Sequence, residues 1–139
     1  MPTVSVRAIP HGDSLDLQRG DTWTITFSRL GSLAGRDSLW FTLKDDKDDA
    51  DTLAWVQIEE TAGLEVINGA AAATPANGSL TVTDAALGNL TVVLEAEESA
   101  KLADVGNLYY DIQIYDDPTV TTMVRGRAVM MGDTTRAVD

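Results

Sequence analysis

The chain has 139 residues, of which 44% are hydrophobic, and its 22 acidic residues against 10 basic ones give a formal net charge of −12. This length suits one domain with a single core, and the absence of cysteine excludes disulfides and thiolate metal sites. Because a negative field of this size repels phosphate, nucleic acid and anionic membranes are not expected as partners.

The first two thirds of the chain are predicted to form an arm followed by short strands. Residues 1–14 contain two prolines, a glycine and the only histidine, a composition typical of a loop. The clearest strand signal follows, because Trp23, Ile25 and Phe27 alternate with small polar residues. Alternation or short apolar runs bounded by turn residues predict strands at 14–21, 22–30, 38–44, 53–60, 63–68, 79–84 and 90–96.

The last third is predicted to contain one helix and a long hairpin. Residues near 97–103 carry the only helix-like pattern, and Gly106 ends it. Two alternating runs, 108–115 and 119–131, flank an Asp-Asp-Pro break and read as paired strands. The side chains expected to face the core are Tyr110, Ile112 and Ile114 in the first run and Val124, Ala128 and Met130 in the second.

These elements predict an all-β fold of about seven to nine short strands with one short helix near 97–103. Turn signals at this spacing favour an antiparallel β-sandwich, with a small closed barrel as the alternative. We expect an N-terminal arm at 1–14, the sandwich domain at 15–131 and a polar C-terminal tail at 132–139.

The sequence does not predict an enzyme or a cofactor. Gly12-Asp13-Ser14-Leu15 matches the signature of a family of serine hydrolases, but the place of the Asp-x-x-His that completes their site reads Asp133-Thr134-Thr135-Arg136. An arginine stays charged and cannot take a proton from serine. With a single histidine and no cysteine, the chain offers few side chains that could act as the nucleophile or general base of nucleophilic catalysis.

The acidic run at 45–51 raises the question of a calcium site. A calcium loop needs carboxylates at its first, third and fifth positions, glycine at the sixth and glutamate at the twelfth. Counted from Asp46, this pattern fails after the third position. The alternatives are a looser metal site and a solvated negative loop, the second being the default; the residues of the looser site would be Asp46, Asp48, Asp49 and Asp51.

Several aromatic and basic residues on the polar faces of strands are candidates for contact with a partner. Trp40 alternates with Leu39, Phe41 and Leu43, so it points away from the core. Either another subunit contacts this tryptophan or a loop of the same chain covers it. The full set of interface candidates is Trp40, Trp55, Tyr109, Tyr115, Arg125 and Arg127.

Four stretches together resemble a known family of phage proteins. They are "RGDTWTITFSR", "SLWFTLK", "GNLTVVLEAEESAKLADVGNLYYDIQI" and "TVTTMVRGRAVMMGDTTRAV", which span roughly residues 13–137. The pattern resembles the immunoglobulin-like N-terminal domain of phage baseplate upper proteins and its single-domain relatives among phage and prophage structural proteins. The block Tyr109–Gln113 is its sharpest part, and the runs at 45–51 and 69–78 are insertions relative to it.

The resemblance implies an immunoglobulin-like sandwich that acts in assembly without catalysis. We therefore expect a stand-alone virion structural protein of the tail, baseplate or head–tail region, which forms homo-oligomers and contacts other virion proteins. No apolar run approaches the ~20 residues of a membrane helix, and the N-terminus lacks the apolar region of a signal peptide, so synthesis is expected in the bacterial cytoplasm. The alternative function is a sandwich module that binds carbohydrate or a host surface through Trp40, Trp55 and Tyr115.

Overall fold

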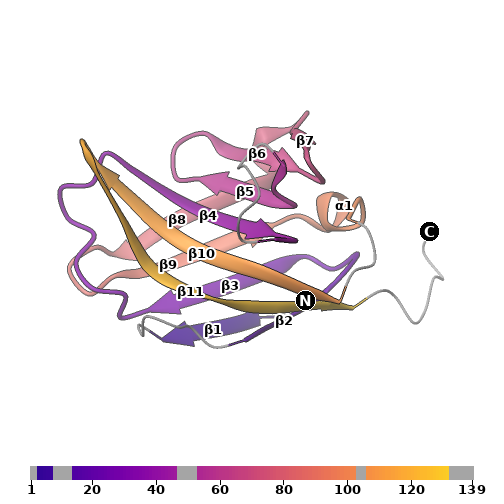
Figure 1. Ribbon diagram of the computed structural model, residues 1–139, viewed down its shortest axis with the longest axis horizontal. Coiled ribbons are helices and arrows are strands. Elements are labelled where there is room, and N and C mark those ends of the chain that lie inside the picture. Colours follow the sequence, from indigo (N-terminus) through magenta and orange to yellow (C-terminus); the bar gives the residue numbers. More distant parts are fainter. Residues whose placement is uncertain (1–2, 8–13, 47–52, 103–105, 132–139) are drawn as a thin grey trace.

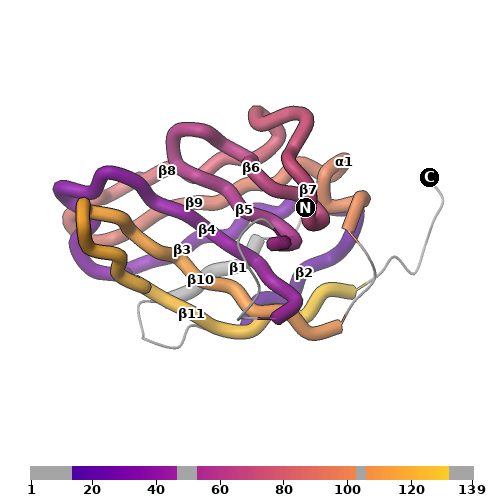
Figure 2. The backbone as a smooth tube through the Cα atoms, turned by 45° about the horizontal axis from the view of Figure 1, so that its top comes forward, coloured from indigo at the N-terminus to yellow at the C-terminus, as the bar shows by residue number. Residues whose placement is uncertain are grey.

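The computed structural model describes residues 3–7, 14–46, 53–102 and 106–131 of the protein. Two β-sheets pack face to face over a common core (Figures 1 and 2). The four-stranded sheet has the order β1 (Thr3–Arg7), β3 (Trp23–Ser28), β9 (Asn89–Leu94), β8 (Gly78–Asp84). The seven-stranded sheet has the order β2 (Leu15–Gln18), β11 (Thr119–Met131), β10 (Asn107–Asp116), β4 (Ser38–Lys44), β5 (Val56–Glu59), β6 (Gly63–Ile67), β7 (Ala70–Ala71).

This strand order is that of a variable-type immunoglobulin sandwich. In such domains strands B, E and D form one sheet, and strands G, F, C, C′ and C″ form the other. Here β3, β9 and β8 take the first set of places, and β11, β10, β4, β5 and β6 take the second. The predicted all-β, immunoglobulin-like sandwich is therefore confirmed, and the closed barrel is wrong for the described residues because the strands form two separate sheets.

The sheets contain two more strands than the segments that the sequence indicated. β1 lies within the predicted arm 1–14, where Pro2 and Pro10 pointed to a loop, and β7 has only two residues in an alanine-rich stretch. β1 pairs in parallel with β3, so residues 3–7 belong to the sandwich. β2 likewise pairs in parallel with β11, and the remaining pairs are antiparallel. The rest of the arm except Ser14, together with the tail 132–139, lies outside the described residues.

Three aromatic rings form the centre of the core. Phe27 of β3 lies 6.1 Å from Phe41 of β4 and 5.9 Å from Tyr110 of β10, measured between ring centroids, and Phe41 lies 6.4 Å from Tyr110. Antibody domains join the corresponding strands B and F by a disulfide that packs on a tryptophan of strand C. In this cysteine-free chain the same three strands are held by aromatic packing, worth about 0.5–1.5 kcal/mol per pair beyond the burial of area.

Tyr110 also explains a glycine in the neighbouring strand. Gly126 of β11 is its cross-strand partner, and a Cβ atom placed on Gly126 would lie 2.8 Å from Cε2 and from the hydroxyl oxygen of Tyr110. The ring therefore lies against the backbone of β11, and the sheet accepts it because position 126 has no side chain.

The short helix α1 (Ala96–Ser99) confirms the element predicted near 97–103, with fewer residues. Four residues do not form a stable helix alone, so contacts with the sandwich must hold it. The buried Ser99 hydroxyl donates to the carbonyl of Asp21 over 2.7 Å and accepts from the backbone nitrogen of Gly20 over 3.1 Å. These bonds tie α1 to the turn between β2 and β3.

Glu98 of α1 is a buried carboxylate with two partners. Its oxygens accept from Asn77 Nδ2 and Lys101 Nζ, at 2.8 Å and 2.9 Å. Burial by itself would raise the pKa of Glu98, but the hydrogen bonds from Asn77 and Lys101 and the charge of Lys101 outweigh it, and the pKa lies below its ordinary value.

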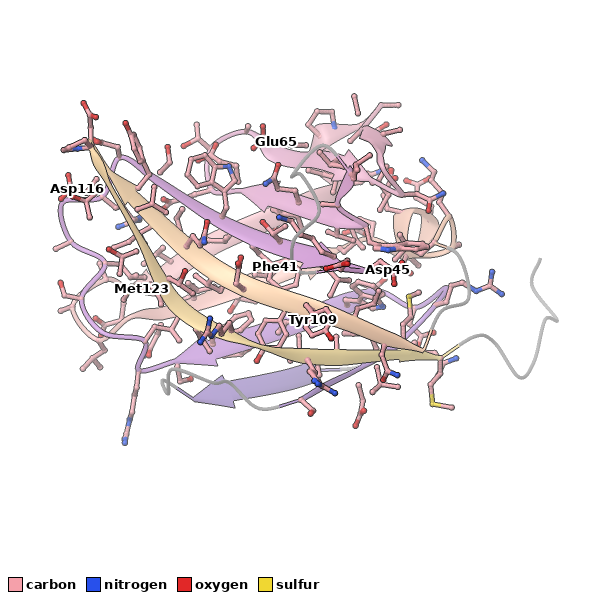
Figure 3. The ribbon with its side chains drawn as sticks, in the orientation of Figure 1. Phe41, Asp45, Glu65, Tyr109, Asp116 and Met123 are labelled. Carbon is pink, nitrogen blue, oxygen red and sulfur yellow. The ribbon has the colours of Figure 1, made fainter. Side chains whose placement is uncertain are left out.

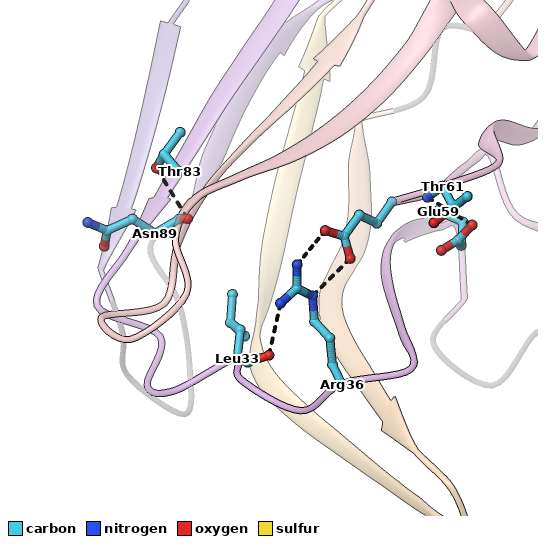
Figure 4. A network of polar contacts seen from close by, with 7 residues as sticks. Leu33, Arg36, Glu59, Thr61, Thr83 and Asn89 are labelled. Atoms are coloured by element: carbon cyan, nitrogen blue, oxygen red, sulfur yellow. Dashed lines mark hydrogen bonds and ion pairs between the residues drawn. The ribbon is translucent and has the colours of Figure 1, made fainter.

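The loop between β3 and β4 is anchored by a bidentate ion pair (Figure 4). Arg36 donates to both carboxylate oxygens of Glu60, from Nε over 2.8 Å and also from Nη2, while its Nη1 donates to the carbonyl of Leu33 over 3.0 Å. The hydrogen bond to Glu60 raises the pKa of Arg36. This pair fixes the entry to β4 against the end of β5, and so the position of the strands that carry the candidate site.

Candidate functional site

The outer face of the seven-stranded sheet carries three rows of polar side chains. Alternation sends Phe41, Leu43 and Ile112 into the core, so their neighbours in β4, β10 and β11 point outward. Strand register then sets which outward side chains meet. The rows, read from β11 through β10 to β4, are Arg127–Tyr109–Lys44, Arg125–Asp111–Thr42 and Thr122–Gln113–Trp40.

These rows line a groove of about 640 Å³. All of their residues except Trp40 contribute to its walls, and Tyr110 and Gly126 complete them. Figure 3 shows Tyr109 on this face, where β10 and β11 cross the front of the molecule. A volume of this size falls within the ~300–1,000 Å³ range of small-molecule sites.

The groove is positively charged on a strongly acidic protein. Lys44, Arg125 and Arg127 contribute three of the chain's ten basic residues, against the single carboxylate of Asp111. The guanidinium carbon of Arg127 lies 5.7 Å from the ring centroid of Tyr109, close enough for a cation–π interaction. Arg125 and Arg127 are both exposed, so a ligand or partner can reach them.

Inside the groove, neutral polar groups are already arranged for hydrogen bonding. Gln113 Nε2 donates to Thr122 Oγ1 over 3.1 Å, and Gln57 Nε2 of β5 donates to Thr42 Oγ1 over 3.4 Å. Groups held in this way lose little freedom when a partner binds. The arrangement can therefore accept an anionic or polar group without a large ordering cost.

The structure brings together three of the six interface candidates, namely Tyr109, Arg125 and Arg127. Trp40 lies in the next row, half-buried, and its Nε1 donates to Glu65 Oε1 of β6 over 3.1 Å. Its cover within the chain therefore comes in part from β6, the second strand along the sheet from β4, whereas the sequence offered a loop or another subunit.

The other two candidates lie away from the groove. Trp55 is half-buried and packs against the core. Tyr115 is half-buried beside the β10–β11 turn, and its hydroxyl donates to Asp117 Oδ1 over 2.7 Å. The three aromatic side chains expected to bind carbohydrate, Trp40, Trp55 and Tyr115, thus do not line the groove.

The candidate metal loop is only partly described. Asp46 is exposed after the end of β4, and Asp48, Asp49 and Asp51 lie outside the described residues. Within the described ranges, no three histidine, cysteine or acidic side chains are grouped closely enough to hold a metal ion. No helix in the same ranges is long and apolar enough to cross a membrane.

Sequence reasoning did not select Thr42, Lys44, Asp111, Gln113 and Thr122 as parts of a site. Alternation already placed Thr42, Lys44, Asp111 and Gln113 on outward faces. The missing information was strand order and register, because the sequence alone does not show that β10 lies between β4 and β11 or which of their residues are paired.

Comparison with known proteins gives likeness of fold alone. No family model matches the sequence, and no curated protein matches it. Among solved structures, the natural killer cell receptor NKp44, described as a triggering partner in natural cytotoxicity, is similar with a TM-score of 0.47 and 15% identity over 85% of this chain and 98% of that one. Bovine butyrophilin is similar with a TM-score of 0.43 and 12% identity; the match covers 92% of this chain and 53% of that chain.

Proposed function

We propose that the protein is a non-enzymatic structural component of a phage or prophage particle, in its tail, baseplate or head–tail region. It acts by assembling with copies of itself and with other virion proteins. The resemblance of residues 13–137 to the immunoglobulin-like domain of baseplate upper proteins supports this class of protein.

The observation that carries the assembly role is the groove on the outer face of β4, β10 and β11. Tyrosine and arginine are enriched at protein interfaces, and Tyr109, Arg125 and Arg127 lie together there. The opposite face of the same sheet is filled by the core. The outer face is therefore the surface of this sheet that is free to bind another subunit.

The assembly role is tested by sedimentation velocity and light scattering on the purified chain between about 1 and 500 μM. We expect a defined oligomer that dissociates on dilution. A monomer over the whole range would contradict self-assembly. The virion class is tested separately, by mass spectrometry of particles released by the bacterium that encodes the chain; purified particles that lack it would refute that class.

A second candidate function is the binding of carbohydrate or of another host-surface group. The volume of the groove and its neutral polar groups, Thr42, Gln113 and Thr122, favour it. Glycan-array binding by the purified chain, lost in a Gln113→Ala variant, would support this candidate over assembly. Absence of binding to any arrayed glycan would remove it.

A further inference from the structure

We propose that the acidic turn of the β10–β11 hairpin of one copy docks in the groove of a second copy, with its carboxylates beside Arg125 and Arg127. The hairpin tip is defined here as residues 115–121. This inference rests on the proposed assembly function and names the two surfaces that would meet.

The hairpin tip is exposed and lies at the end of the molecule opposite α1, where Figure 3 labels Asp116. The residues from Asp116 to Thr122 are all exposed, and Val120 is 58% exposed. An exposed run of this length at the turn of a hairpin can reach a neighbouring molecule. Val120 would give the contact an apolar residue to bury.

The tip is also held in one conformation. The hydroxyl of Tyr115 donates a hydrogen bond to the Asp117 carboxylate. The backbone nitrogen of Asp117 donates to Asp37 Oδ2 over 2.9 Å. The backbone nitrogen of Asp37 in turn donates to the carbonyl of Tyr115 over 2.8 Å. These bonds join the tip to the start of β4. Preorganisation of this kind lowers the entropy lost on binding.

The charges of the two surfaces are opposite. Asp116 and Asp117 give the tip two carboxylates, and Asp37 lies beside them before β4, whereas the groove carries three cations against one carboxylate. Arginine binds carboxylate through two parallel hydrogen bonds, which adds direction to the attraction. On a chain with a net charge of −12, a groove of the other sign is a specific place for an acidic segment to bind.

The tip cannot reach the groove of its own molecule. Both belong to one continuous hairpin, whose pairing runs from Asn107↔Val129 to Asp116↔Thr119, so the strands themselves keep them apart. The contact must therefore join two molecules. We take one tip and one groove to meet at each contact, which is then heterologous, and repetition of it produces a ring or an open filament.

The test uses two variants of the full chain. The tip variant is Asp116→Asn with Asp117→Asn, since an asparagine oxygen can still accept from Tyr115. The groove variant is Arg125→Gln with Arg127→Gln. A matched control, Asp16→Asn with Glu95→Gln, makes the same change of charge as the tip variant at exposed sites elsewhere.

We expect the tip variant and the groove variant each to self-associate about 100-fold more weakly or worse, whereas the control assembles like the parent. Mixed in equal amounts, the two variants should form a dimer of twice 14.9 kDa and nothing larger, because each retains one intact surface. Circular dichroism and urea unfolding check that both variants remain folded.

Assembly that persists in both folded variants would overturn this inference and leave the proposed function standing. So would a mixture that stays monomeric while the parent chain forms oligomers. A parent chain that is monomeric at all concentrations would overturn the inference and the assembly function together.

Discussion

Replacement of Gly126 by alanine tests the packing at the centre of the fold. The added Cβ would lie 2.8–2.9 Å from three atoms of the Tyr110 side chain, where ordinary contacts begin near 3.4 Å. Tyr110 is 2% exposed and packs against Phe27 and Phe41, so its ring has no free space to enter. The sheet must therefore distort locally.

Two opposing contributions set the size of the change in the free energy of unfolding. Overpacking of a filled core destabilises the folded state by roughly 1–3 kcal/mol. Alanine also has less conformational freedom than glycine in the unfolded chain, which stabilises the folded state by about 0.4–1 kcal/mol. We expect Gly126→Ala to lower the free energy of unfolding by about 1–2 kcal/mol, with a fall in Tm of roughly 3–8 °C. Urea titration followed by tryptophan fluorescence measures the change, and an unchanged m-value confirms that the folded state is intact.

Gly106→Ala is the matched control. Among the described residues, and apart from its own chain neighbours, nothing lies within 4 Å of a Cβ built on Gly106, so this variant should be as stable as the parent or slightly more stable. In a Tyr110→Leu background, which removes the ring, the penalty of Gly126→Ala should disappear. Equal stability of the two alanine variants, or a penalty that survives without the ring, would refute the reasoning.

Three further changes test the contacts that support the site. Arg36→Lys should cost about 1 kcal/mol, because an ammonium cannot reproduce the bidentate bond to Glu60; a double-mutant cycle with Glu60→Gln measures the coupling, and a value near zero would contradict it. Ser99→Ala should cost about 1–3 kcal/mol in urea unfolding, because the backbone groups of the β2–β3 turn that it binds lose their buried partner; a cost within error of zero would count against this anchor. Glu98→Gln should cost about 1.5–3 kcal/mol at pH 7 through loss of charged hydrogen bonds. Since the pKa of Glu98 is lowered in the folded state, its stabilisation is present above the unfolded value of 4.5 and is lost as the pH falls through the lower folded value. The gap between parent and Glu98→Gln should therefore close below pH 4.5, and a gap that stays constant there would show that the charge is not responsible.

The faces of the strands were predictable from the sequence. Alternation placed Trp23, Ile25 and Phe27 in the core, and all three are buried, because successive side chains of a strand point to opposite sides. The same rule placed Val124 and Met130 correctly. Ile114, predicted inward, is only half-buried, since a register shift after Ile112 disturbs the hairpin at that point.

The edge strands and the length of the helix were harder to predict from the sequence. Short strands at the edge of a sheet, such as β1 and β7, depend on the neighbour they pair with more than on their own pattern. α1 has only four residues, and its side chains are held by bonds to Gly20 and Asn77, which are distant in sequence. Local propensity carries no information about those distant partners.

The sequence by itself determined an all-β fold, the polar face of each long strand, and the excess of negative charge, whereas the separation into two sheets came from the structure. Only the tertiary structure decided that Lys44 and Arg127 flank Tyr109, and that Arg125 lies beside Asp111. The physical reason is that periodicity within a strand sets the face of each side chain, whereas the neighbours across the sheet are set by strand order and register. Those are properties of the whole folded chain, and the groove exists only through them.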